Sequence, residues 1–497
     1  MPRSLFRLVA TTLKRSALLG ILLVFPLAVA AQPLGLEDLQ GRFNRIDTFL
    51  AGEMQDAGIP SLALAITRNG EVVLAKAFGQ AQPGIKAQVD TPFALGSISK
   101  GMTAMALMTL VDEGKLDPAR PVRAYLETFR TADHRSDSIT VSQLLSHTSG
   151  FSTMDGRNTL TRSGASTIRS MLGGLKGLKL ASAPGTRFEY SNWNYIVAGA
   201  VIEAVSGKDY ATFMKERIFQ PLGMNHTGFL LEGAALGSRS FLGFSRPGAV
   251  PLPGGVAPAG GIFSTARDMG NYLVALQKDG LALGGPVVSP TAFVSLTTGH
   301  APTKRYGYGW GLTKGAIYHA GDNAEFHGDI YLQRVGEVRW GIAILCAKND
   351  PLAETFDPEG AFQMRLMPGV LGILTGQGPK LPLPHAGTRR IILVLVALGL
   401  AAAALGSIAS LRKGKRSAKR SVGRGFLSVL LNLGLHLVLP LTILVALPAV
   451  TASTWPLLLV WAPDAGWILG GFAIVELVVG IVKVIVTIND FRAPRLG

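Results

Sequence analysis

Three apolar segments near the C-terminus constrain this chain more than any other feature. Residues 391–411 hold 21 residues without a charge, and residues 425–450 and 467–488 form two further apolar segments. About 20 helical residues cross the hydrocarbon core of a bilayer, which is about 30 Å thick. The sequence therefore predicts a membrane domain over residues 391–497, with three transmembrane helices in contact with lipid.

The positive charge of the chain lies beside its apolar segments. Of the net charge of +16, thirteen charges fall in residues 1–30, 412–424 and 491–497, which hold no acidic residue. Basic residues concentrate on the cytoplasmic side of membrane spans. Because little net charge remains elsewhere, no basic patch that could bind DNA or RNA is expected, and nucleic acid is excluded as a partner.

Residues 1–31 have the pattern of a secretory signal. Basic residues precede an apolar core at 17–27, and residues 28–30 are small, as cleavage near Ala31 requires. An uncleaved anchor helix is the alternative, and with either form the chain after residue 31 is exported. With the basic loop 412–424 in the cytoplasm, the sequence predicts a multi-pass protein of the cell membrane with an extracytoplasmic domain.

Residues 32–375 remain for that domain, and the proline-containing residues 376–390 for a linker. Two β-like runs meet at Asn69-Gly70, a strong hairpin signal, and three more strand-like runs lie between residues 316 and 348. A helix is expected from about Ser97 to Asp112. Strands at both ends of the domain predict one antiparallel sheet in an α/β (α+β) domain with a helical subdomain.

A serine and a lysine three residues apart, Ser97 and Lys100, open that helix on one face. A desolvated lysine can take the proton that makes serine a nucleophile, and the helix N-terminus favours a developing oxyanion. The pattern alone is weak, because Ser410 and Lys413 repeat it beside an apolar segment. A simple helix N-cap is the alternative for Ser97.

Two more short motifs support a catalytic assignment. Tyr190 and Asn192 place a phenol that can relay a proton beside an amide that can bind a carbonyl. His319 and Gly321 lie in a strand-like run that is expected beside the serine. His226 begins a similar His-x-Gly sequence, but no strand pattern comes after it.

The order Ser-x-x-Lys, Tyr-x-Asn and His-x-Gly resembles the serine β-lactamase and penicillin-binding-protein superfamily, nearest its class C-like branch. That branch also holds esterases, D-stereospecific peptidases and D-Ala-D-Ala carboxypeptidases. Further stretches look like the same branch, at residues 144–150, 221–224, 259–265 and 306–310. The resemblance covers about residues 40–375, leaves out the apolar segments, and implies a β-lactamase/transpeptidase-like fold.

The resemblance implies the proton chemistry of the site. Ser97 attacks an acyl carbon, while Lys100 and Tyr190 share the proton transfer. The lysine ammonium group is expected to favour a phenolate at Tyr190.

The resemblance also implies how substrate is held. Asn192 and His319 bind it, and Gly321 lets its backbone approach the strand. The backbone N–H groups of Ser97 and Asp322 form the oxyanion hole.

Two positions depart from the resembled pattern. His319 stands where the lactamases have a lysine, and histidine is mostly neutral at pH 7, so the grip on a substrate carboxylate is expected to be weaker. Glu325 stands where the branch tends to have glycine. Its side chain would narrow the site, disfavour anionic substrates, or accompany a loss of activity.

Other polar residues receive structural interpretations. His147 is expected to be a hydrogen-bonded loop residue. His327 has no ligand-like partner and no Cys/His cluster exists, so no metal and no cofactor are expected. In the apolar segments, His436, Glu476 and Lys483 could form a functional site. The preferred interpretation is that they make interhelical contacts or extend to the membrane interface.

Two functions are consistent with these patterns. The first is an exported, membrane-anchored serine hydrolase that cleaves peptide, amide, ester or β-lactam bonds of a small molecule or short peptide through an acyl-enzyme. The alternative is a catalytically weak sensor that binds wall peptide or a protein with a lactamase-like head. The complete set Ser97, Lys100 and Tyr190 favours the hydrolase, whereas Glu325 and the additional spans favour the alternative.

Overall fold

The computed structural model describes residues 36–162, 164–248, 251–282, 284–379, 386–413, 432–451 and 453–492. It divides into two units. The N-terminal unit holds residues 16–239 and 245–384, and the C-terminal unit holds residues 240–244 and 385–497. The predicted signal sequence and most of the predicted basic loop lie outside the described residues.

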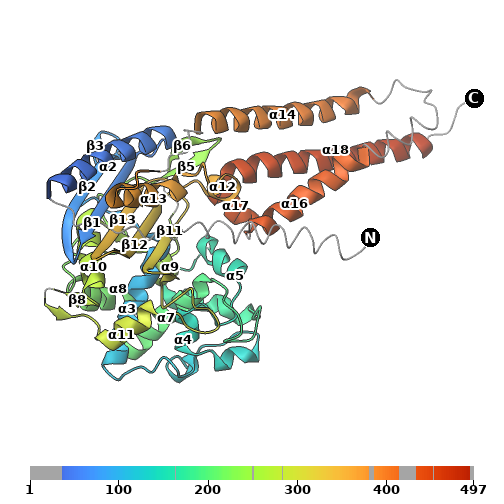
Figure 1. The fold of residues 1–497 in the computed structure, drawn as a ribbon. Coiled ribbons are helices and arrows are strands. Elements are labelled where there is room, and N and C mark those ends of the chain that lie inside the picture. Colours follow the sequence, from blue (N-terminus) through green and yellow to red (C-terminus); the bar gives the residue numbers. More distant parts are fainter. Residues whose placement is uncertain are drawn as a thin grey trace, which may run out of the picture. The chain divides into compact units, whose positions relative to one another are not determined.

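A seven-stranded antiparallel sheet forms the centre of the N-terminal unit (Figure 1). Strand β1 pairs with β13, with Ala65 opposite Ala343, so strands from both ends of the domain meet in one sheet, as predicted. The order is β10 (Gly311–Thr313), β11 (Ala316–Asp322), β12 (His327–Val335), β13 (Val338–Cys346), β1 (Ser61–Arg68), β2 (Glu71–Gln82) and β3 (Ile85–Lys86).

The predicted hairpin at Asn69-Gly70 is confirmed. Asn69 and Gly70 have φ angles of 50° and 80° and join β1 to β2. A two-residue turn with positive φ at both positions matches the right-handed twist of the strands, and asparagine and glycine adopt it at low cost.

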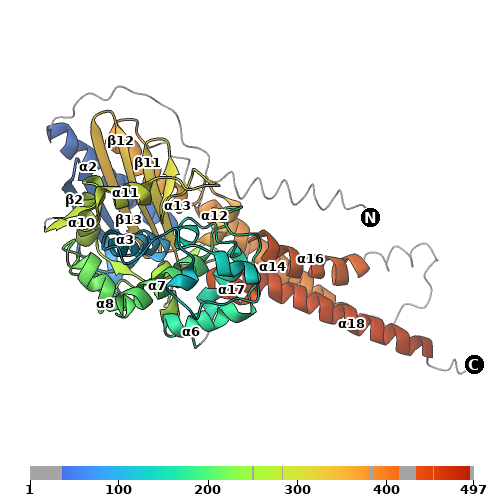
Figure 2. The same ribbon diagram turned by 90° about the horizontal axis from the view of Figure 1, so that it is seen from below.

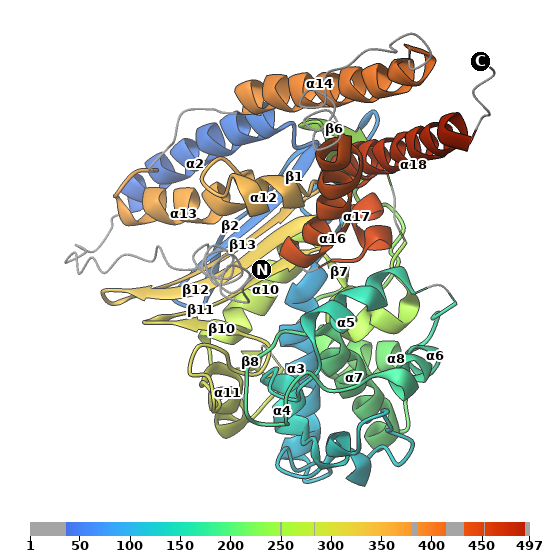
Figure 3. The ribbon, with the colours of Figure 1, turned by 90° about the vertical axis from the view of Figure 1, so that its right-hand side faces the viewer.

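Both faces of the sheet are covered by helices (Figure 3). Helices α2 (Leu36–Ala57) and α13 (Phe362–Thr375) pack on one face against Leu62, Leu64 and Ile66 of β1. Ala63 and Ala65 point to the opposite face, which packs against α10 (Ala266–Gln277). Alternate residues of β1 therefore enter two different cores, which explains why this strand is apolar throughout instead of alternating.

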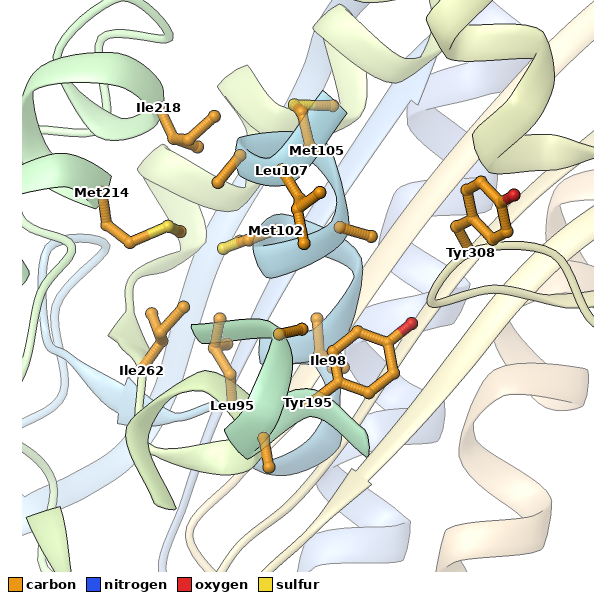
Figure 4. Packing of buried hydrophobic residues seen from close by; sticks show 14 of the residues in the cluster. Leu95, Ile98, Met102, Met105, Leu107, Tyr195, Met214, Ile218, Ile262 and Tyr308 are labelled. Carbon is orange, nitrogen blue, oxygen red and sulfur yellow. The ribbon is translucent and has the colours of Figure 1, made fainter. Parts of the chain in front are cut away.

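Helix α3 (Ser99–Asp112) lies at the centre of the second core, with every residue from Ser99 to Leu110 buried. Apolar side chains from several helices surround it (Figure 4). It confirms the predicted helix, which begins two residues later than expected, after the 3₁₀ turn η1 (Gly96–Ile98).

The predicted helical subdomain is also present (Figure 2). Its helices are α4 (Val141–Leu145), α5 (Thr153–Asn158), α6 (Ile168–Leu172), α7 (Asn192–Ser206) and α8 (Tyr210–Met214). The other α-helices and strands of the N-terminal unit are β4 (Phe93–Ala94), α9 (Ala257–Gly260), β7 (Phe263–Ser264), β8 (Leu281–Ala282), β9 (Gly285–Pro286), α11 (Pro290–Thr297) and α12 (Pro351–Phe356). Strands β5 (Ser238–Phe241) and β6 (Phe244–Pro247) each have residues in both units. Helices α7, α8 and α9 pack directly on α3.

The C-terminal unit is helical. It contains α14 (Ala386–Lys413), the π-helical turn η9 (Gly434–Val438), α16 (Leu439–Val450), α17 (Trp455–Trp461), the π-helical turn η10 (Asp464–Leu469) and α18 (Gly470–Arg492). Residues 387–411 and 464–485 are each long and apolar enough to cross a membrane. Residues 434–450, within the predicted middle span, and residues 455–461, in the predicted connection, form a pair of helices bent by 75°. The described residues therefore offer two spans, or three if that pair crosses as one.

Candidate active site

Ser97 lies in the turn η1, and it is the one residue between Thr91 and Leu110 that is not buried. No side chain caps the start of α3 or of η1. The alternative of Ser97 as a simple helix cap is therefore excluded. The turn instead presents its hydroxyl at the accessible end of an otherwise buried helix.

Lys100 is fully buried, and its Nζ lies within hydrogen-bond distance of three oxygens. Ser97 Oγ is 2.8 Å away, Asn192 Oδ1 3.0 Å and the Ala259 carbonyl oxygen 2.6 Å. Burial lowers the pKa of Lys100 well below its ordinary value. A neutral amine can donate its two N–H groups to Asn192 and Ala259 and accept the Ser97 proton on its lone pair, which is the geometry of a general base.

Tyr190 completes the group around the serine. Lys100 Nζ lies 4.9 Å from the centre of its ring, and its hydroxyl is hydrogen-bonded with Ser97. Burial raises the pKa of Tyr190 above its ordinary value and outweighs the Ser97 hydrogen bond, which lowers it. The expectation of a phenolate was therefore wrong: removal from water disfavours the charged form of both partners, leaving an amine and a phenol.

The His147 ring packs against the ring of Tyr190. Its Nδ1 accepts hydrogen bonds from the Ser191 N–H at 3.2 Å and from Asn194 Nδ2 at 2.8 Å, and its ring centre lies 4.2 Å from that of Tyr190. Burial, together with Lys100 and His319, lowers its pKa well below the ordinary value. Because the accepting nitrogen is occupied, His147 is the hydrogen-bonded loop residue that the sequence predicted.

Two glycines allow strand β11 to pack closely against η1, the turn that carries Ser97. A Cβ on Gly321 would lie 1.9 Å from the Leu95 carbonyl oxygen, and a Cβ on Gly96 would lie 2.5 Å from the backbone nitrogen of Asp322. The Asp322 amide therefore lies beside η1, where the oxyanion hole was expected. At Gly321, however, the group that approaches closely is the Leu95 carbonyl oxygen. A glycine is therefore needed here for the packing of η1 against β11, whether or not a substrate also approaches.

His319 is neutral, as expected from its residue type. Burial, and to a lesser extent the nearby Lys100, lowers the pKa of His319 to about 4. Its Nδ1 lies 2.5 Å from the Ala320 carbonyl oxygen, which only accepts, so Nδ1 carries the proton and Nε2 accepts from Tyr306 Oη at 3.1 Å. The imidazole is thus held in one tautomer beside Lys100 without charge.

Glu325 is buried and turned toward the start of β5. Its Oε1 lies 3.8 Å from Arg239 Nε, and its Cβ lies where a side chain on Gly237 would be. The Glu325 carboxylate is thus directed toward the partly exposed Arg239 guanidinium group, and the expectation that Glu325 narrows the site stays a prediction.

The sequence interpretation missed a histidine with a raised pKa at the start of β12, opposite the end of β11. The buried His327 lies between two carboxylates, with Nδ1 2.8 Å from Asp322 and Nε2 3.1 Å from Asp329, and they hold its pKa well above the ordinary value despite burial. A signal for it existed, since His327 and Asp329 alternate on one strand face and Asp322 is opposite in register. Arg157, on α5, interacts electrostatically with Tyr190 and Asp322, and no local pattern marked it.

Comparison with known proteins identifies the family of the chain. The family model described as Beta-lactamase matches residues 46–361, more than half of the chain. The chain belongs to the beta-lactamase family. Among the described residues of this family member, no three His, Cys, Asp or Glu side chains are placed to hold a metal ion.

Relatives of known sequence share about a quarter of their residues with this chain. Protein flp of Staphylococcus aureus strain MRSA252 is 24% identical over 318 residues, covering 62% of this chain and 63% of that protein. A protein named "Putative D-alanyl-D-alanine carboxypeptidase" of Salmonella enteritidis is 26% identical over 348 residues, covering 61% and 80%. The chain thus spans less than two thirds of the length of the flp relatives.

Solved structures show the same fold. The octameric penicillin-binding-protein homologue from Pyrococcus abyssi superposes with a TM-score of 0.57 at 26% identity, covering 70% of this chain and 81% of that one. FmtA from Staphylococcus aureus gives 0.55 at 21%, covering 70% and 94%, and a class C β-lactamase gives 0.55 at 20%, covering 64% and 94%. The predicted superfamily is confirmed.

Proposed function

We propose that this protein is a serine hydrolase that works through an acyl-enzyme on Ser97. The observation that carries the proposal is the contact of 2.8 Å between Ser97 Oγ and Lys100 Nζ, a buried amine whose pKa is lowered. A lysine of this kind can act as a base near neutral pH, whereas an exposed lysine stays charged.

The steps are set by the positions of the groups. The Ser97 proton moves to Lys100 Nζ as Oγ bonds to the acyl carbon, and the carbonyl oxygen becomes an oxyanion between the N–H groups of Ser97 and Asp322. Loss of one such donor costs about 3 kcal/mol. As the oxyanion collapses, the bond between the acyl carbon and the leaving group breaks. The Tyr190 phenol, which is hydrogen-bonded with Ser97, gives its proton to the leaving group and takes the proton of the Lys100 ammonium group in its place. Water then attacks the ester on Ser97, and its proton returns through the same two residues.

The preferred substrate is an ester or blocked amide without a free carboxylate. The Salmonella relative is named for a reaction whose substrate ends in a carboxylate. In the present chain the neutral His319 stands at the position of the lactamase lysine, so a charge that would attract such a carboxylate is absent there.

Anchoring in the membrane and export are part of the proposal. Two apolar helices long enough to span support anchoring, and the charge pattern of residues 1–30 and 412–424 supports an extracytoplasmic N-terminal unit.

Covalent labelling tests the proposal. A fluorophosphonate probe should label the purified full chain, and Ser97→Ala should abolish labelling. Ser410→Ala is a matched control, since Ser410 repeats the Ser-x-x-Lys spacing in α14 and its hydroxyl only donates to the Ser407 carbonyl oxygen. Unlabelled wild-type protein would favour the non-catalytic sensor instead.

A further inference from the structure

Three ionisable side chains meet inside the C-terminal unit, on helical segments 434–450 and 470–486 whose other residues are not ionisable. His436 Nδ1 lies 2.6 Å from Glu476 Oε2, and Lys483 Nζ lies 2.7 Å from His436 Nε2. Lys483 also donates to Asn432 Oδ1 at 3.2 Å. We call His436, Glu476 and Lys483 the membrane triad.

The helices are shaped around this triad. Glu476, Gly480 and Lys483 recur at helical spacing and share one face of α18. A Cβ on Gly480 would lie 2.8 Å from His436 Cβ and 3.1 Å from its carbonyl oxygen, so the glycine admits His436 between the two charged side chains. His436 itself lies in the π-helical turn η9, a distortion that recurs at functional sites.

Two members of the triad, His436 and Glu476, are buried in protein even without lipid around them, whereas Lys483 is partly exposed. Glu476 is 0% exposed and His436 4% exposed, and Glu476 Oε1 has no hydrogen-bond partner among the described residues. Helices α16 and α18 lie side by side, and α14 also contacts α18 (Figure 1). Residues 391–411 of α14, all of α16 and all of α17 carry no ionisable group. In η10, Asp464 is ionisable but accepts from the Leu242 N–H, about three turns of helix from Glu476.

A purely structural contact explains this arrangement poorly. Buried ion pairs contribute little net stability because desolvation offsets their attraction, and ionisable groups within spans are costly. If position 476 served packing alone, an apolar residue such as leucine would fit the apolar segment around it without the cost of burying a carboxylate. An oxygen of a fully buried carboxylate that lacks a partner is instead a place where a proton can be added.

The contacts also restrict which atoms of the triad can carry protons. An ammonium group that donates to Nε2 and an Nδ1–H group that donates to the carboxylate satisfy both short contacts. A doubly protonated imidazole would set two donors against each other across 2.7 Å, so uptake of a proton by histidine breaks the contact with Lys483. Transfer from Nζ to Nε2, with transfer from Nδ1 to Oε2, instead yields an amine, a neutral imidazole and a carboxylic acid. The Lys483 amine, which is only partly buried, then takes up a proton from water, so the triad gains one proton in total.

We propose that the membrane triad is a proton-binding relay. Its ligand is the hydrogen ion, which Glu476 binds and releases through His436 and Lys483. The two ends of the relay are seven residues apart on α18, about 10 Å along the helix. This activity does not depend on the hydrolase site, and its test does not require a substrate.

Infrared difference spectroscopy of the full chain in lipid nanodiscs tests the relay. Lowering the pH should produce the C=O band of a protonated carboxylic acid. Glu476→Gln should remove the band and Glu476→Asp should move its frequency, whereas Ser97→Ala and Ser410→Ala should keep it. After a pH jump, His436→Gln should slow the appearance of the band by about a hundredfold, as expected for loss of an acid–base group.

Several outcomes would overturn the relay. Wild-type protein without a pH-dependent acid band would do so, as would a band unchanged in Glu476→Asp, a conservative variant that serves if Glu476→Gln does not fold. An unchanged rate in His436→Gln would exclude histidine as the carrier. Fluorophosphonate labelling of each variant reports on the hydrolase separately, so failure of the relay and failure of the proposed function are distinguishable.

Discussion

At the scale of single residues, the charge of Lys100 determines whether its amine can accept the proton of the Ser97 hydroxyl. The amine is removed from water and lies among a hydroxyl, an amide and a carbonyl, and burial alone accounts for the lowering of its pKa. The folded protein therefore holds this lysine in a form that the unfolded chain would protonate. Catalytic competence and stability are linked through the same proton.

Lys100→Met tests that link. In the wild type, the unfolded chain binds more protons at Lys100 than the folded chain between the lowered pKa and about 10.5, so wild-type stability rises with pH there. The methionine variant lacks this rise. Its free energy of unfolding, measured by denaturant titration relative to wild type, should fall as the pH increases from 7 toward 10. A difference that stays constant with pH would show that Lys100 is charged in the folded protein.

Substrate preference is a second question at this scale. His319→Lys should restore a charge at the position where His319 is neutral. A hydrogen bond to a charged group contributes about 1.5–3 kcal/mol, or about ten- to a hundredfold. We expect the ratio of kcat/KM for a penicillin to that for a matched ester to rise by that factor. The wild-type ratio should show no contribution from His319 between pH 5 and 8, because its pKa is about 4. An unchanged ratio in His319→Lys would mean that position 319 does not face the substrate carboxylate.

At the scale of elements, the contact between η1 and β11 sets the geometry of the site. The turn and the strand come from distant parts of the sequence, and they touch only because Gly96 and Gly321 have no side chains. Side chains at either position would separate Ser97 from the Asp322 amide.

Gly321→Ala measures the importance of this contact. A Cβ placed 1.9 Å from the Leu95 carbonyl oxygen must push backbone apart, and such overpacking typically costs about 1–3 kcal/mol. We expect that loss in the free energy of unfolding together with weaker probe labelling. Gly41→Ala is the control: its Cβ would meet nothing within 4 Å in α2, and it should stabilise by about 0.5–1 kcal/mol. Equal stability of the two variants would contradict the account.

The elements that local patterns determine could be predicted from the sequence. The hairpin at Asn69-Gly70 depends on two φ angles, and α3 coincides with an apolar run ending before Gly114. The charge of Tyr190 could not be predicted, because it depends on how far packing removes the phenol from water. Arg157 was missed for the same kind of reason, since only the tertiary fold brings α5 near Tyr190.

At the scale of the whole molecule, the charge distribution is the basis for predicting which side of a membrane each part would occupy. The described helices establish two possible spans, or three with the bent pair, and this number decides whether the two ends of the C-terminal unit share a side. The seven basic residues of 412–424 predict that their loop is cytoplasmic.

Reporter fusions test the orientation. An enzyme that is active only outside the cytoplasm should function when fused after Leu381 and fail when fused after Ser417. Replacing the basic residues of 412–424 with glutamine should weaken this preference, because basic residues set the orientation of nearby spans. Activity at Ser417 and none at Leu381 would reverse the proposed topology.

The central claim is that Ser97 forms the acyl-enzyme with Lys100 as its base, and the position of the covalent bond tests it most directly. Full-length protein would be treated with the fluorophosphonate probe or a slowly hydrolysed ester, digested, and mapped by mass spectrometry. The account predicts one modified residue, Ser97, in wild type and in Ser410→Ala, and strongly reduced modification in Lys100→Met. Modification of any other serine, or undiminished modification of Ser97 in Lys100→Met, would contradict it.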